Sequence, residues 1–202
     1  MIKLRPTVVS FLVSGRGSNF TVAAKKILAG EISARCGVVL SNKEDAPALE
    51  AARRLGIQAV YVGGSRERRE EEMLRLLAAC RTNLVVAAGY MSILSPKFIA
   101  AYKNRIINVH PSLLPSFAGL DAQTQALEYG VKIAGCTTHF IDEGTDTGPI
   151  IMQAAVAVAE NDTRKSLAAK ILKEEHRILP ASIKLFCEGK LKIKGRRVVI
   201  TK

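Results

Sequence analysis

The sequence is poor in several residues whose abundance would mark a function class. Aromatic residues make up 5% of the 202 residues and tryptophan is absent, so a surface built for stacking nucleic-acid bases is not expected. No apolar run approaches the roughly 18 residues of a membrane-spanning helix. We therefore expect no membrane partner.

Cysteine is also scarce and scattered. The four cysteines form no Cys-x-x-Cys pair and have no histidine at ligand spacing; they are Cys36, Cys80, Cys136 and Cys187. This pattern disfavours both a zinc site and a disulfide scaffold. We expect no metal, and reduced thiols in a cytoplasmic compartment.

The remaining composition is that of a globular protein. Apolar residues account for 48% and charged residues for 24%, and the length suits a single domain over residues 1–202. The net charge of +12 would attract anions, which include phosphate-bearing small molecules as well as nucleic acid.

Apolar runs alternate with helical patterns, which is typical of an α/β fold with one doubly wound, mostly parallel sheet and helices on both faces. Strands are expected at about 7–13, 34–40, 59–62, 84–88 and 106–109. Helices are expected at about 18–29, 46–55, 66–79 and 96–102. A short helix at 121–128, strands at 132–140 and 150–158, a long helix at 163–187 and a terminal hairpin around Gly195 follow. The later strands lack long crossover helices, so part of the C-terminal sheet is expected to be antiparallel.

Asn108 and His110 follow the apolar pair Ile106-Ile107 and precede Pro111. Alternation along a strand points both side chains to one face, at the carboxyl end where α/β sheets bind ligands. An ordinary strand end with a hydrogen-bonded histidine explains the stretch equally well. Ser112 lacks the Gly-x-Ser-x-Gly elbow of a nucleophilic serine, so a serine triad is not favoured.

The loop at 14–19, Ser-Gly-Arg-Gly-Ser-Asn, joins a strand to a helix. Its glycines and the helix N-terminus favour a phosphate site. Phe20 stands where a dinucleotide fingerprint has its third glycine, and no Walker Lys-Ser/Thr follows. A plain glycine turn with Ser18 or Asn19 as helix cap remains the alternative.

Three further features carry chemistry. The segment 89–96 follows a strand and would wall a pocket for a flat heterocycle, although core packing explains it as well. The loop at 141–149 carries Asp146 in a glycine-flanked turn, where its carboxylate would stabilise a charged His110. Glu175 falls within the apolar face of the long helix. A carboxylate on such a face must have polar partners or lie at the rim of a binding site. His139 is interpreted as a structural or supporting histidine.

Taken together, these motifs resemble the folate-dependent formyltransferases that act on phosphoribosylglycinamide (GAR). The resemblance rests on motifs that occur in order along nearly the whole chain: Ser-Gly-Arg-Gly-Ser-Asn at 14–19, Ser-Asn-Lys at 41–43, Gly-Tyr-Met at 89–91, Asn-Val-His-Pro-Ser-Leu-Leu-Pro at 108–115, Gly-Leu-Asp-Ala at 119–122, Asp-Thr-Gly-Pro-Ile at 146–150 and Glu-His at 175–176. It implies a Rossmann-like formyltransferase fold and formyl transfer from 10-formyltetrahydrofolate to GAR in purine synthesis. It implies small-molecule substrates, without nucleic acid, and a monomer or homodimer.

The resemblance also implies roles for individual residues. Asn108, His110 and Asp146 match the family's catalytic trio. Gly17, Ser18 and Asn19 match its substrate-phosphate loop, and Glu175 matches a residue that binds the substrate's ribose. The residues that match the folate site are Arg66, Met91, Ser92, Ile93, Leu94, Asn108, Asp142, Glu143, Gly144, Thr145 and Asp146. The N-terminal half would thus bind the substrate phosphate, and the C-terminal half would bind folate and perform catalysis.

Two departures and two alternatives qualify this interpretation. The family usually has arginine at the position of Ser92, near the benzoyl-glutamate end of folate, and a polar residue at the position of Leu172. A hydrolase of 10-formyltetrahydrofolate would use a similar trio, with water as acceptor. A basic, non-catalytic nucleic-acid binder is the alternative of another class; it would use Lys184, Lys190, Lys192, Lys194, Arg196, Arg197 and Lys202.

Overall fold

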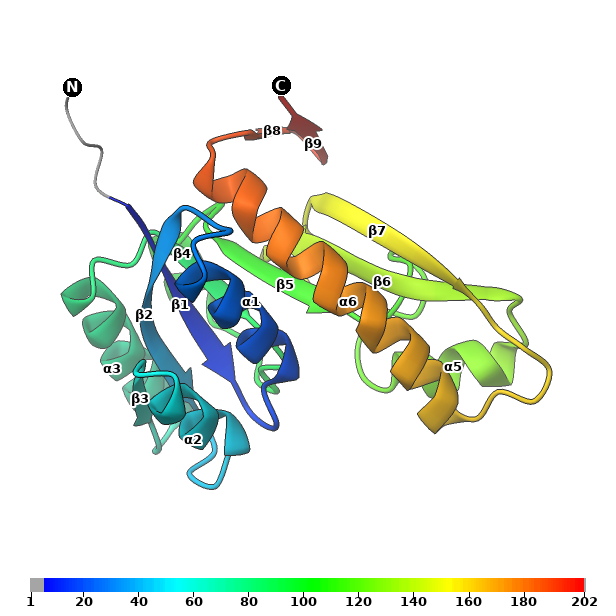
Figure 1. The fold of residues 1–202 in the computed structure, drawn as a ribbon, viewed down its shortest axis with the longest axis horizontal. Helices are drawn as coiled ribbons and strands as arrows, with labels where there is room; N and C mark the ends of the chain where they lie inside the picture. Colours follow the sequence, from blue (N-terminus) through cyan, green and yellow to red (C-terminus); the bar gives the residue numbers. More distant parts are fainter. Residues whose placement is uncertain (1–5, 202) are drawn as a thin grey trace. The chain divides into compact units, whose positions relative to one another are not determined.

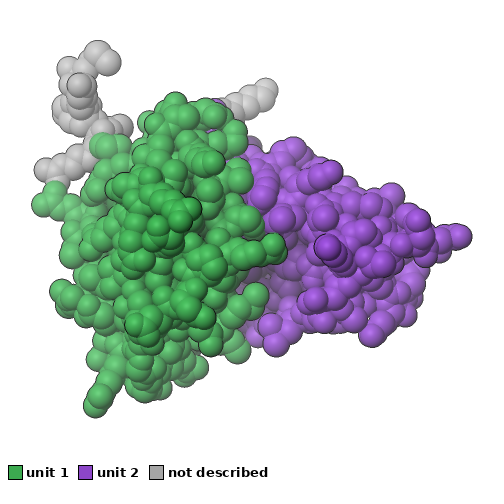
Figure 2. All heavy atoms as spheres, turned by 60° about the horizontal axis from the view of Figure 1, so that its bottom comes forward, with its two compact units in different colours: residues 1–107 green, residues 108–202 purple. Residues whose placement is uncertain are grey.

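The computed structural model describes residues 6–201, so Lys202 of the predicted basic surface lies outside the described residues. The chain forms two compact units, residues 1–107 and residues 108–202 (Figure 2). Within residues 6–201, no helix is both long enough and apolar enough to cross a bilayer.

The first unit is a parallel sheet with helical crossovers (Figure 1). Its elements are β1 (Thr7–Val13), α1 (Ser18–Leu28), β2 (Ala34–Ser41), α2 (Pro47–Arg54), β3 (Gln58–Tyr61), α3 (Arg66–Ala79), β4 (Leu84–Ala87) and α4 (Pro96–Ala101). The strand order is β3-β2-β1-β4. Because parallel crossovers are right-handed, this order places α1 and α2 on one face and α3 on the other.

The direction of the strand order changes between β1 and β4, which is where open α/β sheets bind ligands. Hydrogen bonds of Ser14 tie the strand ends together there. Its backbone N–H donates to the Gly89 carbonyl at 3.1 Å. Its Oγ donates to Asn42 Oδ1 at 2.6 Å and accepts from the Met91 N–H at 2.7 Å. The loops after β1, β2 and β4 therefore form one connected surface.

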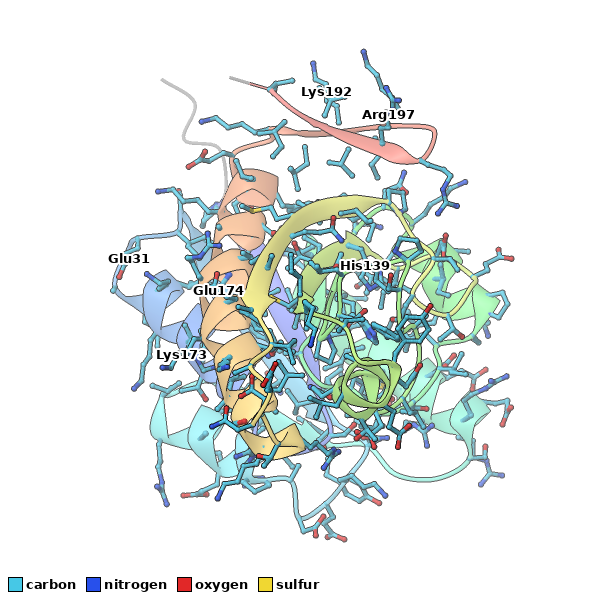
Figure 3. All side chains as sticks on the ribbon, turned by 90° about the vertical axis from the view of Figure 1, so that its right-hand side faces the viewer. Glu31, His139, Lys173, Glu174, Lys192 and Arg197 are labelled. Atoms are coloured by element: carbon cyan, nitrogen blue, oxygen red, sulfur yellow. The ribbon has the colours of Figure 1, made fainter. Side chains whose placement is uncertain are left out.

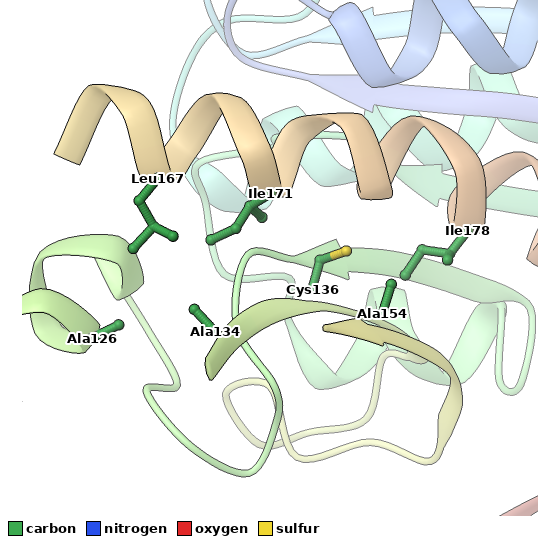
Figure 4. Close-up of a cluster of buried hydrophobic side chains, with 7 residues drawn as sticks. All are labelled: Ala126, Ala134, Cys136, Ala154, Leu167, Ile171 and Ile178. Carbon is green, nitrogen blue, oxygen red and sulfur yellow. The ribbon is translucent and has the colours of Figure 1, made fainter. Parts of the chain in front are cut away.

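The second unit combines antiparallel strands with a long helix. The chain enters it along β5 (Ile106–His110) and continues through α5 (Ala122–Tyr129), β6 (Ile133–Phe140), β7 (Ile150–Ala157), α6 (Arg164–Cys187), β8 (Leu191–Lys194) and β9 (Arg197–Ile200). β6 pairs with β7 and β8 pairs with β9, both antiparallel. Leu167, Ile171 and Ile178 of α6 pack over Cys136 and Ala154 of these strands (Figure 4).

The predicted fold class is confirmed: parallel strands come first and antiparallel strands end the chain. The predicted terminal hairpin is also confirmed, as β8 and β9. Lys192 and Arg197 project from this hairpin (Figure 3).

Residues just before α6 stabilise its N-terminus. Thr163 and Ser166 form a reciprocal capping box. Lys170 Nζ, 2.5 Å from Asp162 Oδ2, lowers the pKa of Asp162 to about 2, with further help from Ser166 Oγ and the Ala159 N–H. An ionised Asp162 is therefore part of the folded state at neutral pH.

Replacing Asp162 with asparagine is expected to lower the urea midpoint of unfolding. A folded-state pKa below the unfolded value of about 3.9 means that the stabilisation is complete above that pH and is lost as pH falls towards 2. The difference in midpoint between wild type and Asp162→Asn should thus be constant from pH 7 to pH 5 and narrow below pH 4. Glu160→Gln, at an exposed neighbour, is the control, and equal midpoints at pH 7 would contradict the prediction.

Candidate active site

The end of β5 supplies two polar side chains to the second unit. Asn108 and His110 are separated by Val109, so strand alternation places them on the same face. His110 is 5% exposed, although it lies directly before the loop that begins at Pro111. A polar group buried at this level requires hydrogen-bond partners.

Both ring nitrogens of His110 face oxygen acceptors. Nδ1 lies 3.2 Å from Asp146 Oδ2, and Nε2 lies 2.9 Å from the backbone carbonyl oxygen of Phe117. A carboxylate and a carbonyl can only accept, so each nitrogen must carry a proton to satisfy both contacts. The arrangement therefore suits the charged imidazolium.

Asp146 connects the members of this cluster. Its backbone has a φ of 55°, in the left-handed region that is uncommon for residues other than glycine. Oδ2 accepts a hydrogen bond from the Gly119 N–H at 2.9 Å. Burial, the largest single influence, raises the pKa of Asp146, but its contacts with His139 and with the Gly119 N–H and the charge of His110 together lower it. The carboxylate is thus ionised at neutral pH.

His139, labelled in Figure 3, supports Asn108 from β6. Its Nδ1 lies 2.9 Å from the Phe140 carbonyl oxygen, which only accepts, so the proton resides on Nδ1. The neutral ring then presents Nε2 as an acceptor, 3.1 Å from Asn108 Nδ2. This fixes the orientation of the amide, whose nitrogen also lies 3.5 Å from Asp146 Oδ1.

Replacing His139 with leucine is expected to lower kcat about tenfold, because a buried amide N–H left without its acceptor costs roughly 1–3 kcal/mol and the orientation of Asn108 is lost. His139→Gln retains an acceptor oxygen and should recover part of that loss. Steady-state kinetics at saturating substrates measure both variants. Wild-type kcat in His139→Leu would show that the amide does not depend on this ring.

The loop that holds Asp146 depends on a close approach of its own backbone. A Cβ at Gly148 would lie 1.7 Å from the Phe140 carbonyl oxygen. Asp142 Oδ1 accepts from the Gly144 N–H at 3.1 Å and from Thr147 Oγ1 at 2.6 Å, which organises the turn. The predicted folate residues Asp142, Glu143, Gly144 and Thr145 therefore lie in the same ordered turn as Asp146.

Ser112 takes no part in a triad. Its Oγ donates to the Ser116 carbonyl oxygen at 2.5 Å, and the side chain is buried. The hydroxyl therefore stabilises the turn that follows β5.

In the first unit, the structure places the predicted phosphate loop at the start of α1. Gly17 has a φ of 69°, and a Cβ there would lie 2.5 Å from Ala48 Cβ, so both conformation and packing require glycine. Ser18 and Asn19 are the first residues of α1, where backbone N–H groups have no partner within the helix. This is the geometry of an anion site.

The segment after β4 is largely open to solvent. Met91 and Ile93 are 68% and 70% exposed, whereas Leu94 is buried. Ser92 Oγ accepts a hydrogen bond from Arg69. Arg66 lies on α3 and lines a cavity of about 250 Å³.

The structure thus brings Asn108, His110 and Asp146 together in the second unit. Glu175 lies in that unit, 7% exposed on α6. The first unit connects the phosphate loop to Met91 through Ser14. Sequence reasoning missed the contacts of Gly119 and Phe117 with the cluster, and it gave His139 only a supporting role. The available signal was the alternation of side chains along the strand of His139, which lies in the same sheet as β5, because this alternation determines the face to which His139 points.

Comparison with known proteins agrees with these observations. The model of the formyl transferase family matches residues 7–183. The chain belongs to the formyl transferase family. One relative is phosphoribosylglycinamide formyltransferase of Escherichia coli (strain K12). It is 38% identical to this chain over 186 residues, which are 90% of this chain and 88% of that protein.

Two solved structures are also similar to this chain. Glycinamide ribonucleotide transformylase 1 from Symbiobacterium toebii has a TM-score of 0.95 and 47% identity over 98% of this chain and 95% of that one. A formyltetrahydrofolate deformylase from Pseudomonas syringae has a TM-score of 0.92 and 25% identity, with 98% of this chain and 67% of that one covered. The chain spans 14% of the length of the trifunctional purine biosynthetic protein adenosine-3 of Drosophila melanogaster, to which it is 40% identical.

Proposed function

We propose that the chain transfers the formyl group of 10-formyltetrahydrofolate to the amine of GAR, in purine synthesis. The observation that carries this proposal is the contact of an imidazole, a carboxylate and an amide at the end of β5, in a chain of the formyl transferase family. Both substrates are small molecules, and we also propose a cytoplasmic location.

The first chemical step joins the GAR amine nitrogen to the formyl carbon. The carbonyl oxygen becomes an oxyanion, and an N–H of Asn108 donates to it. The contact of Asn108 Nδ2 with Asp146 Oδ1, at 3.5 Å, is long for a hydrogen bond. That N–H is therefore the one available to the oxyanion, while the other donates to His139. Such a donor is worth about 3 kcal/mol in the transition state.

The second step breaks the bond between the formyl carbon and the folate nitrogen. His110 donates the proton that the leaving nitrogen takes up, and Asp146 stabilises the charged ring before that transfer. The proton lost by the attacking amine passes to Asp146 and restores the imidazolium. Formyl-GAR and tetrahydrofolate are the products, and the step needs no covalent enzyme intermediate.

Binding of the two substrates is assigned to the remaining residues. Gly17, Ser18 and Asn19 bind the phosphate of GAR at the start of α1, and Glu175 binds its ribose hydroxyl groups. The segment Met91 to Leu94 and the turn of Asp142 to Thr145 bind the pteridine. Arg66 would lie near the folate tail. Residues 1–202 would form a single formyltransferase domain.

The alternative activity is hydrolysis of 10-formyltetrahydrofolate, and the Pseudomonas syringae neighbour is named a formyltetrahydrofolate deformylase. Water needs no phosphate anchor, whereas the loop at Gly17 has the geometry of an anion site. A titration of the purified chain with GAR alone separates the two activities. Binding that is lost in Gly17→Val supports the transferase, and no GAR binding by wild type would overturn it.

A further inference from the structure

Arg69 on α3 contacts the segment that follows β4. Its Nη2 donates to Ser92 Oγ at 3.2 Å, and its Nη1 donates to the Gly64 carbonyl oxygen at 3.2 Å. Tyr90 lies beside it: burial raises the pKa of Tyr90, while the charge of Arg69 and hydrogen bonds with Arg69 and Ser92 act in the opposite direction. The guanidinium is thus held between the segment that follows β4 and the loop that precedes α3.

These contacts leave donors of Arg69 available. A guanidinium has five N–H donors, and Nε of Arg69 is buried without a hydrogen-bond partner among the described residues. Neutral hydroxyl and carbonyl oxygens accept from the other nitrogens. The charge of Arg69 contributes to the lowered pKa of Glu67, but Arg69 forms no salt bridge among the described residues. A cation held in this way remains able to bind an anion.

Apolar side chains flank the position that Arg69 contacts. Met91 and Ile93, on either side of Ser92, are 68% and 70% exposed. Exposed apolar side chains next to a fixed guanidinium suit a ligand that joins a flat aromatic ring to a carboxylate. The tail of a reduced folate, an aminobenzoyl group linked to glutamate, has this chemistry.

The neighbouring arginine has a different environment. Arg66 lines its cavity together with Glu67, Glu70 and Glu71. Glu67 interacts electrostatically with both arginines, whereas Glu70 and Glu71 line the cavity of Arg66 and weaken its attraction for a further anion. The carboxylate of Glu70, moreover, accepts hydrogen bonds from the Ser95 N–H and hydroxyl at the start of α4. Of the two arginines, Arg69 is the better placed to bind an anion beside Met91.

We propose that Arg69 binds the glutamate carboxylate of the folate donor, and that it supplies from α3 the guanidinium that this chain lacks at position 92. The inference rests on the proposed function for the identity of the donor. It concerns one contact of that donor, not the reaction itself.

The test compares folates with and without the glutamate tail. Arg69→Ala, Arg69→Lys and wild type are titrated with 5-formyltetrahydrofolate and with its pteroate analogue, which lacks glutamate, by calorimetry without turnover. Arg68→Ala, at the exposed preceding position of α3, is the matched control. Thermal unfolding of each variant shows whether the fold is retained.

Arg69→Ala is expected to weaken binding of the glutamate-bearing folate about ten- to hundredfold, the usual range for a hydrogen bond to a charged group. Binding of the pteroate analogue should change by less than about twofold, and Arg69→Lys should recover part of the loss. An equal loss for both ligands would overturn the proposal, because a merely structural role affects the whole site. Unchanged binding of both would overturn it as well.

A double variant provides an independent check. Arg69→Ser combined with Ser92→Arg moves the guanidinium to the other side of the contact, and it is expected to bind the glutamate-bearing folate better than Arg69→Ser alone. No recovery in a folded double variant would contradict the proposal. Failure of the proposed function appears differently: a hydrolase would still bind both folates but would transfer no formyl group to GAR, and the comparison of the two folates would still test Arg69. Wild type that binds neither folate would overturn the proposal for Arg69 as well.

Discussion

Replacing Asp146 with asparagine is expected to lower kcat about a thousandfold, within the range that general acid catalysis usually contributes. The change is nearly isosteric, but it removes the charge that stabilises the His110 imidazolium at 3.2 Å. The Gly119 N–H and His110 Nδ1 both face Oδ2 of Asp146. The side-chain amide of the asparagine can offer them only one oxygen, and its NH2 group cannot accept a hydrogen bond. The variant therefore loses the charged His110 that acts as the acid, and it also disturbs the hydrogen bonds around residue 146. Single-turnover formyl transfer at saturating GAR measures the chemical step directly.

The pH dependence of this step follows from the same contacts. The pKa of Asp146 is lowered, so its carboxylate loses its charge only when pH falls below the ordinary aspartate range. Wild-type kcat should show no loss from this group between pH 5 and pH 8.

The control for the Asp146→Asn variant is Asp45→Asn, at an exposed position of the first unit, which should retain wild-type kcat. An Asp146→Asn variant within a few-fold of wild type would remove the carboxylate from the mechanism.

Replacing Asn108 with alanine is expected to lower kcat by about 10²–10³, the usual cost of one oxyanion donor. Because the donor acts on charge that exists only after the amine attacks, KM for both substrates should change little. The effect should exceed that of His139→Leu, since His139 acts only by orienting the amide. Steady-state kinetics with each substrate varied in turn measures kcat and KM.

The control for this variant is Asn161→Ala, in the exposed turn before α6. Dissociation constants for folate should be close to wild type in both variants. If Asn108→Ala raised KM for folate and left kcat unchanged, the amide would bind the donor in its ground state and would not stabilise the oxyanion.

Much of the fold followed from local patterns. Apolar periodicity acts over a few residues, so the helix expected at 163–187 and the strand expected at about 106–109 lie within one residue of α6 and β5. The antiparallel pairing of β6 with β7 followed from the short connection between them. The proximity of Asp146 to His110 was an expectation from the glycine-flanked turn, and the distance of 3.2 Å agrees with it.

Other features depend on backbone positions that no local pattern specifies. The Phe117 carbonyl reaches His110 because Phe117 has a φ of 53°, in the left-handed region. The Gly119 N–H reaches Asp146 through the same irregular turn. The contact of Arg69 with Ser92 joins a helix to a loop that lies 23 residues further along the chain. Such contacts require the three-dimensional placement of both segments.

The fate of the formyl group tests the central claim most directly. The purified chain is incubated with GAR and with 10-formyltetrahydrofolate that carries labelled carbon in its formyl group, and the products are separated. Direct transfer predicts that the label appears in formyl-GAR, one mole for each mole of tetrahydrofolate, and that omission of GAR stops the release of tetrahydrofolate. Label recovered as free formate, at a rate that is independent of GAR, would contradict the account.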